Sequence, residues 1–193
     1  GLIQLYHYDS LFETVHTSHP VRCFCEDEDG NILIGTKGSG IKLLNPATKE
    51  LTDYLNESKG LISNSVYALR RNKANDIFIG TEGTGINILN AATGRLEKLE
   101  IPDKYPPFKA VYNIYFTNND SLLWVGTSGY GLIKINISRE QGRYHVKGFR
   151  QYNSSDKNIS LNNDVVYAIT SDPENNMLWF GTRGGGLNCI NMK

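Results

Sequence analysis

The sequence has little of what marks a protein that binds nucleic acid or crosses a membrane. Its 20 basic residues are balanced by 20 acidic residues, so no electrostatic surface for nucleic acid or for an anionic membrane is expected. Its apolar runs are much shorter than the roughly 20 residues that span a bilayer. Residues 1–4 lack the basic start and the long apolar core of a signal peptide. These absences predict either a cytosolic protein or the mature or excised part of an exported one.

Cysteine and histidine are also scarce, and neither has the spacing of a chemical site. There are three cysteines, and an odd count in a chain of this size is not a disulfide framework. Cys23 stands at a position that takes small residues in the other copies of the repeat described below, so we expect a small buried hydrophobe rather than a metal or redox ligand. The histidines lack metal-site spacing: His7, His16, His19 and His145. The sequence therefore predicts no metal and no cofactor.

One phrase occurs four times in the chain. It is a short apolar run, then Gly-Thr-x-Gly-x-Gly, then Ile/Leu-x-x-Ile/Leu-Asn, and it occupies residues 32–45, 77–90, 123–136 and 178–191. The first glycines of the copies are separated by 45, 46 and 55 residues and are Gly35, Gly80, Gly126 and Gly181. A period in this range indicates one supersecondary unit that is repeated along the chain.

Each copy has the pattern of four short antiparallel strands. A run rich in Val, Tyr, Ile and Phe predicts the first strand and begins at Val21, Val66, Val111 or Val166. A polar turn, the apolar run, the glycine turn and the Ile/Leu-x-x-Ile/Leu-Asn run follow, and a weaker, more polar fourth strand ends the unit. Middle strands that are apolar on both faces fit a sheet with a neighbour packed on each side, and a polar fourth strand fits an outer edge. We therefore predict an all-β fold of β-propeller blades, each with four antiparallel strands.

Aromatic residues recur at fixed places in this unit. Tyr67, Tyr112 and Tyr167 each follow the valine of a first strand, and Trp124 and Trp179 stand in second strands. Glycine and aromatic marks that repeat from blade to blade are typical of propellers. We expect both sets of rings to pack in the core between blades.

The chain ends do not coincide with blade ends. Residues 1–6 match a third strand, the segment with His7, Tyr8 and Asp9 falls where a fourth strand belongs, and the chain stops just after another third strand. The predicted division is a partial blade at 1–18, full blades at 19–62, 63–108 and 109–163, and the first three strands of a last blade at 164–193. Leftover strands at both ends predict a fragment, about four blades, of a larger propeller.

The pattern L-x-x-N-x-V-x-x-[IL], a polar turn and L-W-[IV]-G-T-x-x-G-G-L resembles the repeat of the two-component regulator propellers. Residues 61–69 match its opening and residues 178–187 match its core. The resemblance covers essentially the whole chain, although the first glycine of the G-G pair is present only as Gly185, where the other copies have Ser39, Thr84 and Tyr130. It implies the periplasmic sensor region of a hybrid two-component histidine-kinase receptor, which detects glycans or their breakdown products.

The resemblance also implies that a kinase and a transcription regulator belong to other parts of the parent polypeptide. No histidine-kinase or receiver motif occurs in the 193 residues, so we expect this chain to be no enzyme and to contact no nucleic acid. The expected location is the periplasm, as the extracytoplasmic part of an inner-membrane receptor, with the membrane reached only through other parts of that protein. The expected partners are an oligosaccharide, the remaining blades or a second copy of the chain.

The evidence for a catalytic or ligand-binding motif is weaker than the evidence for the repeat. The glycine turns precede strands rather than helices and lack the Lys-Ser/Thr of a phosphate-binding loop, so we expect structural turns. Residues 26–30 resemble part of a calcium loop, but Thr36 stands where the bidentate acid belongs. No Gly-x-Ser-x-Gly motif of a serine hydrolase occurs. Paired carboxylates from distant loops stay open as a glycosidase or lyase site.

Ligands of a propeller are expected at the loops that the rigid scaffold presents at one end of the central channel. The turn between the second and third strands and the loop that leads into the first strand lie there, and their side chains vary between copies. The candidate ligand-binding residues are Tyr130, Arg183, Lys37, Glu82, Asn64, Asn162 and Asn163. A tyrosine can stack on the apolar face of a sugar, and an arginine can bind a carboxylate or a sulfate.

The resemblance implies an extracytoplasmic ligand-recognition domain of a two-component receptor, which detects glycans or oligosaccharides and signals to a kinase outside this chain. One alternative is a propeller scaffold for protein interaction or dimerisation. A second alternative is a carbohydrate-active lyase or hydrolase built on similar blades. An oligosaccharide that binds and stays intact favours the sensor, product formation favours the enzyme, and binding only to protein favours the scaffold.

Overall fold

The strands form five separate antiparallel sheets in the part of the chain that the computed structural model describes, which is residues 2–6, 12–156 and 161–192. A two-stranded hairpin comes first and consists of β1 (Leu2–Tyr6) and β2 (Phe12–His16). Three four-stranded sheets and one three-stranded sheet follow in chain order. The described helix is a short 3-10 turn, η1 (Glu57–Lys59), and no described helix has the length and apolar character needed to cross a membrane.

Each of the four larger sheets is a blade whose strands neighbour one another in sequence order. Blade 1 contains β3 (Val21–Glu26), β4 (Ile32–Thr36), β5 (Ile41–Leu44) and β6 (Leu51–Leu55). Blade 2 contains β7 (Val66–Arg71), β8 (Ile77–Thr81), β9 (Ile86–Leu89) and β10 (Leu96–Lys98). Blade 3 contains β11 (Val111–Thr117), β12 (Leu122–Thr127), β13 (Leu132–Glu140) and β14 (Arg143–Tyr152). Blade 4 contains β15 (Val166–Asp172), β16 (Met177–Thr182) and β17 (Gly186–Asn191).

The prediction of an all-β fold with four-stranded propeller blades is therefore confirmed. The hairpin of β1 and β2 precedes blade 1, where the sequence predicts a partial blade. The fourth strand that the sequence predicts at His7, Tyr8 and Asp9 lies outside the described residues, and the described partner of β1 is β2.

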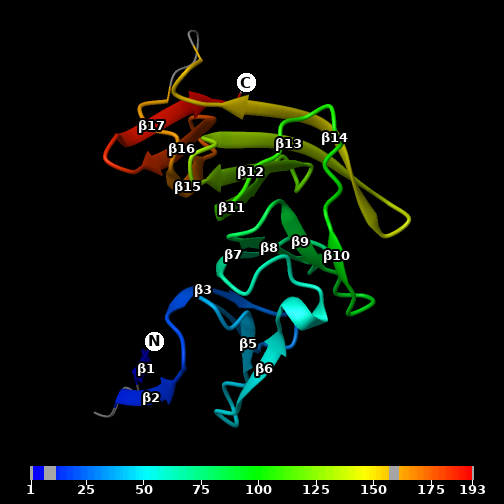
Figure 1. Cartoon of the computed structure of the whole chain (residues 1–193), viewed down its shortest axis with the longest axis vertical. Coiled ribbons are helices and arrows are strands. Elements are labelled where there is room, and N and C mark those ends of the chain that lie inside the picture. Colours follow the sequence, from blue (N-terminus) through cyan, green and yellow to red (C-terminus); the bar gives the residue numbers. More distant parts are fainter. Residues whose placement is uncertain (1, 7–11, 157–160, 193) are drawn as a thin grey trace.

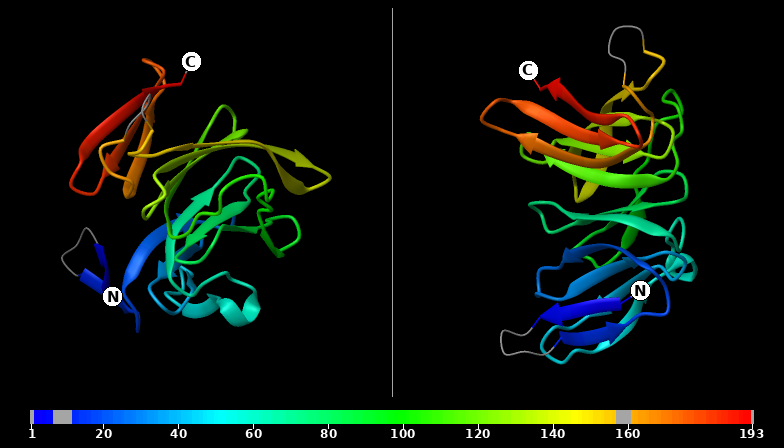
Figure 2. Two further views of the ribbon diagram at one scale, coloured as in Figure 1. Left: turned by 45° about the horizontal axis from the view of Figure 1, so that its top comes forward. Right: turned by 90° about the vertical axis from the view of Figure 1, so that its left-hand side faces the viewer.

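The blades follow one another in an arc, with their first strands on the inner side. Contacts between successive blades join β3 to β7, β7 to β11 and β11 to β15. Figure 1 shows these four strands on one side of the molecule and β6, β10 and β14 on the other. Figure 2 shows from two further directions that the sheets stack face to face, with the N-terminal and C-terminal parts at opposite ends of the stack. The first strands thus lie where a propeller has its axis.

The hydrophobic core is divided into layers, one between each pair of neighbouring blades. Representative residues are Leu33 and Val66 between blades 1 and 2, Phe78 and Ile133 between blades 2 and 3, and Trp124 and Phe180 between blades 3 and 4. Trp124 is fully buried, as predicted, whereas Trp179 in blade 4 is half-buried. Each middle blade is therefore covered on both faces, which explains why its central strands are apolar on both sides.

The first glycine of the repeat is required by this close packing. A Cβ atom at Gly80 would lie 2.5 Å from a methyl carbon of Val111 in the next blade, and side chains in a packed core leave no such space to spare. Gly35 and Gly126 meet the equivalent valines at 2.9 and 3.0 Å. Gly181 in blade 4 has no described atom within 4 Å of the same position.

The glycine turns also join each blade to the next through the backbone. The N–H groups of Gly38 and Gly40 donate to the carbonyl of Asn64 in the next blade at 3.0 and 2.8 Å. The equivalent N–H groups of blade 3 donate to the carbonyl of Asp164 at 3.0 and 2.8 Å. A phosphate-binding loop needs such N–H groups for the anion. Because the protein itself uses them, these turns are structural.

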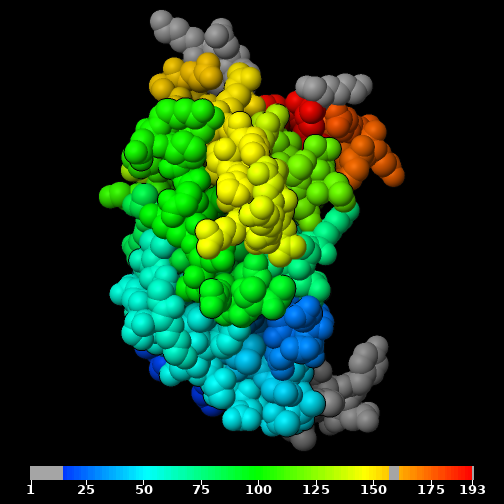
Figure 3. Space-filling model, turned by 90° about the vertical axis from the view of Figure 1, so that its right-hand side faces the viewer, coloured from blue at the N-terminus to red at the C-terminus, as the bar shows by residue number. Residues whose placement is uncertain are grey.

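The longer step between the third and fourth glycine phrases forms a hairpin that extends from blade 3 over blade 2. The pairing of β13 with β14 shifts after Asn136, and we call the segment beyond it, residues 137–147, the long hairpin. Figure 3 shows this hairpin, in yellow, lying across the outer surface of the green segments of blade 2. The Asn90 side chain of blade 2 donates to the carbonyl of Gly142 at its tip, at 3.2 Å. The insertion therefore links blade 3 to blade 2 on their outer side.

Candidate functional site

The first strand of every blade contains the same irregularity. The pairing of the first and second strands shifts immediately after the opening valine in all four blades. A β-bulge leaves one residue without a partner and can re-aim its side chain. The residues at the bulges are Arg22, Tyr67, Tyr112 and Tyr167. We call these four residues the bulge row.

The side chains of the bulge row contact one another from blade to blade. The guanidinium carbon of Arg22 lies 5.9 Å from the centre of the Tyr67 ring. The Tyr67 and Tyr112 rings meet edge to face with their centres 5.0 Å apart. The Tyr112 and Tyr167 rings are nearly parallel, with centres 5.4 Å apart. Each contact crosses from one blade to the next, so the row runs over all four blades.

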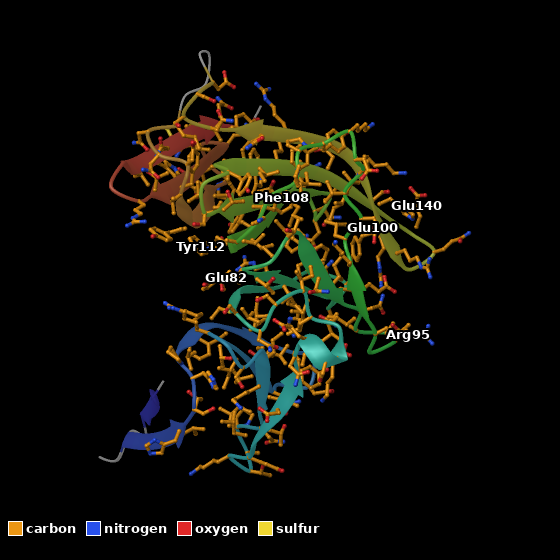
Figure 4. All side chains as sticks on the ribbon, in the orientation of Figure 1. Glu82, Arg95, Glu100, Phe108, Tyr112 and Glu140 are labelled. Atoms are coloured by element: carbon orange, nitrogen blue, oxygen red, sulfur yellow. The ribbon has the colours of Figure 1, made fainter. Side chains whose placement is uncertain are left out.

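The row lies on the inner side of the arc and remains accessible. Figure 4 shows Tyr112 and Glu82 together on that side, and Arg95 and Glu140 at the opposite, outer edge. Tyr167 is 49% exposed, and Tyr67 and Tyr112 are half-buried. The rings do pack between blades, as the sequence predicts, but their place is a surface at the axis rather than the core.

The hydroxyl groups of the row differ from those of the structural tyrosines. The Tyr115 hydroxyl shares a hydrogen bond with Ser171 at 2.9 Å. Within the described residues, the hydroxyls of Tyr67, Tyr112 and Tyr167 form no hydrogen bond. A phenol can donate one hydrogen bond and also accept, so the row presents ring surface together with polar groups available to a ligand.

Two charged groups act on Tyr67 in the row. Burial, the nearby Glu82 carboxylate and the Tyr112 ring raise the pKa of Tyr67, and the positive charge of Arg22 opposes this rise. Tyr67 therefore keeps its proton at neutral pH and remains a hydrogen-bond donor. Glu82 is the sequence-predicted candidate that the fold brings to the row.

The other candidates on the glycine turns have exposed side chains. Lys37, Glu82 and Arg183 are all exposed, and the backbone N–H of each donates to the residue before its own first strand, at 2.9, 2.9 and 3.0 Å. Tyr130 is half-buried and packs against the core layer between blades 2 and 3. Its carbonyl accepts from the Gln151 amide at 2.8 Å.

The candidate asparagines take part in turns. The Asn64 side-chain oxygen accepts from the Glu57 N–H at 2.8 Å, and the Asn64 N–H donates to the Glu57 carboxylate at 2.9 Å. The Asn162 side-chain oxygen accepts from the Thr182 hydroxyl at 2.8 Å. The Asn163 side-chain oxygen accepts from a backbone N–H two residues on, at 2.9 Å. Such bonds stabilise the loops that lead into the first strands.

Sequence reasoning did not select the bulge row as a binding site, because periodic tyrosines also fit a packed core. The available signal was their place directly after the opening valine of the innermost strand. The bulge that turns them toward the axis depends on the register with the second strand, and that register is set by pairing rather than by local sequence.

The part of the sequence that resembles a calcium loop is a turn. Asp27 accepts the N–H groups of Asp29 and Asn31 at 3.0 and 2.8 Å and also the Asn31 amide at 3.0 Å. In residues 2–6, 12–156 and 161–192, no three His, Cys, Asp or Glu side chains lie close enough to share a metal ion. Burial raises the pKa of the Cys23 thiol to about 12, which fits the predicted role of a small packed residue.

A comparison with known families identifies the repeat in two segments of the chain. The family described as the two component regulator propeller matches residues 17–38 and residues 160–184. These segments contain the first two strands of blade 1 and of blade 4 with their intervening turns. Two segments of the chain therefore match the two-component regulator propeller repeat, as its motifs predict. No curated protein matches the sequence.

Several solved structures share the fold. The extracellular domain of a B. thetaiotaomicron protein named as a one component system aligns over 97% of this chain and 30% of its own, with a TM-score of 0.60 and 20% identity. The extracellular domain of a protein named as a hybrid two component system in the same organism aligns over 94% and 36%, with a TM-score of 0.55 and 18% identity. Virginiamycin B lyase from Staphylococcus aureus aligns over 98% and 62%, with a TM-score of 0.62 and 15% identity. The chain thus spans about a third of the length of the first two relatives, and these likenesses establish the propeller fold.

Proposed function

We propose that this chain, which carries two-component regulator propeller repeats, is a ligand-recognition segment of an extracytoplasmic sensor and that its bulge row binds a carbohydrate. The observation that supports this proposal is the bulge row itself: three tyrosine rings in contact across blades 2, 3 and 4, with hydroxyls that no described residue uses. Recognition on a surface held by a rigid scaffold is the general pattern for such folds.

The chemistry of the row suits a sugar. One face of a sugar ring is apolar and can stack on a tyrosine ring, while its hydroxyls can exchange hydrogen bonds with the phenols. Arg22 at the end of the row and Glu82 beside Tyr67 add a charged donor and a charged acceptor. Because the row extends over several blades, an oligosaccharide is a better fit than a single sugar.

The proposal extends to the signalling context. The kinase that responds to the ligand belongs to other parts of the polypeptide, and this chain contributes recognition rather than phosphate transfer. A periplasmic location agrees with the extracellular domains among the structural relatives.

The experiment is a thermal-unfolding screen of the chain against plant, host and microbial oligosaccharides, with the sugars examined afterwards by chromatography. A ligand at about one hundred times its dissociation constant adds roughly 2.7 kcal/mol to the free energy of unfolding, which is a clear shift in Tm. A shift with the sugar intact supports the sensor. Product formation would instead indicate a lyase or hydrolase, and binding to protein alone would indicate a scaffold.

The bulge row itself is tested by substitution. We expect Tyr112→Ala to abolish the ligand-induced shift, because it removes the central ring, and Tyr112→Phe to retain part of it through stacking. Tyr105→Ala is the matched control. Tyr105 lies in an outer loop, and its ring stacks on Phe149 of β14, with ring centres 4.9 Å apart. A full shift in Tyr112→Ala would place the carbohydrate site elsewhere.

A further inference from the structure

Blade 3 carries two adjacent positive charges on its face toward blade 4. Lys134 in β13 takes a position that other blades fill with uncharged residues: Leu43, Ile88 and Cys189. Directly opposite Lys134 in β14 stands Arg150, and like charges opposed in this way destabilise a sheet. Within the described residues, neither Lys134 nor Arg150 forms an ion pair. The two charges therefore lack a counter-ion from the described protein.

Both cations are held in place by aromatic rings. The Lys134 ammonium lies 5.3 Å from the centre of the Trp124 ring, and the Arg150 guanidinium carbon lies 4.9 Å from the centre of the Tyr152 ring. The Trp124 and Tyr152 rings are themselves 6.2 Å apart in the core layer between blades 3 and 4. Cation–π contact positions a charge without neutralising it, and groups positioned in advance lose less entropy when a ligand binds.

Lys134 also lines a polar cavity of about 650 Å³ at the end of blades 3 and 4 opposite the glycine turns. The polar residues that line it with Lys134 are Thr117, Asn118, Ser121, Asn136 and Asn176. No carboxylate occurs among the described residues of its wall. The Trp124 indole N–H donates to the Thr117 hydroxyl at 2.9 Å, so the hydroxyl proton of Thr117 can turn toward a ligand.

We propose that this cavity, with Lys134 in its wall, binds an anionic group on a polar ligand: a carboxylate, a sulfate or a phosphate. The Lys134 ammonium can form a short, charge-assisted hydrogen bond with such a group. The Thr117 hydroxyl and the second N–H of the Asn118 and Asn176 amides, whose first N–H groups donate to Ser121 and Asn191, complete the shell. The volume lies within the usual range for small-molecule sites and exceeds what a bare inorganic anion fills. The site is separate from the bulge row and does not depend on carbohydrate binding there.

The first test is calorimetric titration of the chain with sodium glucuronate, phosphate and sulfate at constant ionic strength, with glucose as the neutral control. We expect saturable binding of at least one anion and none of glucose. Tighter binding of glucuronate would identify a carboxylate-bearing sugar as the source, and tighter binding of phosphate or sulfate would identify an inorganic or esterified anion. The absence of saturable binding by all three anions would overturn the proposal.

Substitutions then locate the site. Lys134→Met should lower the affinity for the anion by about tenfold or more, as expected for the loss of a hydrogen bond to a charged group. Lys42→Met is the matched control, because Lys42 stands opposite Asp53 in blade 1 and is already paired with it. It should bind the anion as the wild-type chain does.

Arg150→Asp keeps the inference testable if Lys134→Met does not fold. It places a carboxylate opposite Lys134, as Asp53 stands opposite Lys42, and should abolish anion binding while leaving the fold intact. Wild-type affinity in Arg150→Asp, or in a folded Lys134→Met, would contradict the proposal. Tyr112→Ala should still bind the anion, so this site and the carbohydrate site of the bulge row can fail independently.

Discussion

At the residue scale, identical repeats place the same residue in different surroundings. Gly80 faces Val111 of the next blade with no room for a methyl group, while Gly181, its equivalent in blade 4, has no described atom within 4 Å. The bulge tyrosines show the same effect, because Tyr67 and Tyr112 are half-buried whereas Tyr167 in blade 4 is 49% exposed. A position that recurs in the sequence therefore has an energetic role only where a neighbouring blade contacts it.

We expect Gly80→Ala to lower the free energy of unfolding by about 1–3 kcal/mol, the usual effect of overpacking a core. Gly181→Ala is the matched control, with the same local sequence and free space around it, and should change stability little. Urea-induced unfolding of both variants measures the difference. Equal effects of the two substitutions would show that the valine contact is not what requires glycine.

The three cysteines should react with thiol reagents at different rates. The thiolate is the reactive form, and burial raises the pKa of Cys23 to about 12 and also raises that of Cys25, whereas Cys189 is exposed. Near pH 8 we expect rapid labelling of Cys189 and labelling of Cys23 only after unfolding. Mass spectrometry of the labelled peptides locates each reaction, and Cys189→Ser should remove the fast phase. Rapid labelling of Cys23 in the folded chain would contradict its packed position.

At the element scale, the long hairpin accounts for the unequal spacing of the repeats. Its residues meet a buried carboxylate of blade 2: the Asp76 side chain is fully buried, accepts from the Tyr144 hydroxyl at 2.7 Å and pairs with Arg139 at 3.1 Å. The Asn72 amide in turn donates to the Tyr144 hydroxyl at 2.6 Å. Burial and the Asp76 carboxylate raise the pKa of Tyr144, so the phenol stays protonated and donates to Asp76.

Asp76→Asn should lower the free energy of unfolding by about 1–3 kcal/mol, because it removes the charge that Arg139 pairs with and one acceptor of a buried network. Thermal and urea unfolding measure this loss. The control is Glu140→Gln at the tip of the hairpin, where the Glu140–Lys147 pair is exposed and should contribute nothing measurable. A stability equal to that of the wild type in Asp76→Asn would mean that the long hairpin is not fastened to blade 2 through this residue.

At the scale of the whole molecule, stability follows from the stacking of blades. Every residue of β9 in blade 2 is buried, whereas most residues of β17 in blade 4 are exposed. The core layers lie between blades, so a blade with neighbours on both sides buries both of its faces, and a blade with one neighbour buries only one. Repeat units that contact only their neighbours gain stability from each interface they form.

Amide hydrogen exchange should reveal this difference in burial between blades. Amides of β8 and β9 should exchange most slowly and those of β17 much faster, because segments with few buried apolar contacts unfold locally at low free energy. Exchange measured by mass spectrometry on peptides from each blade compares them within one molecule. Uniform protection from blade 1 to blade 4 would indicate that the chain unfolds as a single unit. The exposed face of blade 4 would then not lower its local stability.

Local sequence patterns were enough to predict the architecture. The period of the glycine phrase predicted blades, the apolar runs predicted the central strands, and the glycines predicted turns, because each of these follows from local backbone preference and from the spacing of apolar residues. The small residue at Cys23 and the buried ring of Trp124 were also predictable, since both lie in blades whose packed face meets a neighbouring blade.

Where the functional groups meet depends on the three-dimensional fold. The bulges that aim Arg22 and three tyrosines at the axis depend on strand register, and the adjacency of Lys134 and Arg150 depends on how β13 pairs with β14. The contact of Asp76 with Arg139 depends on the position of the long hairpin over blade 2. Such arrangements join residues far apart in the chain, and no local pattern encodes them because pairing and packing set the distances.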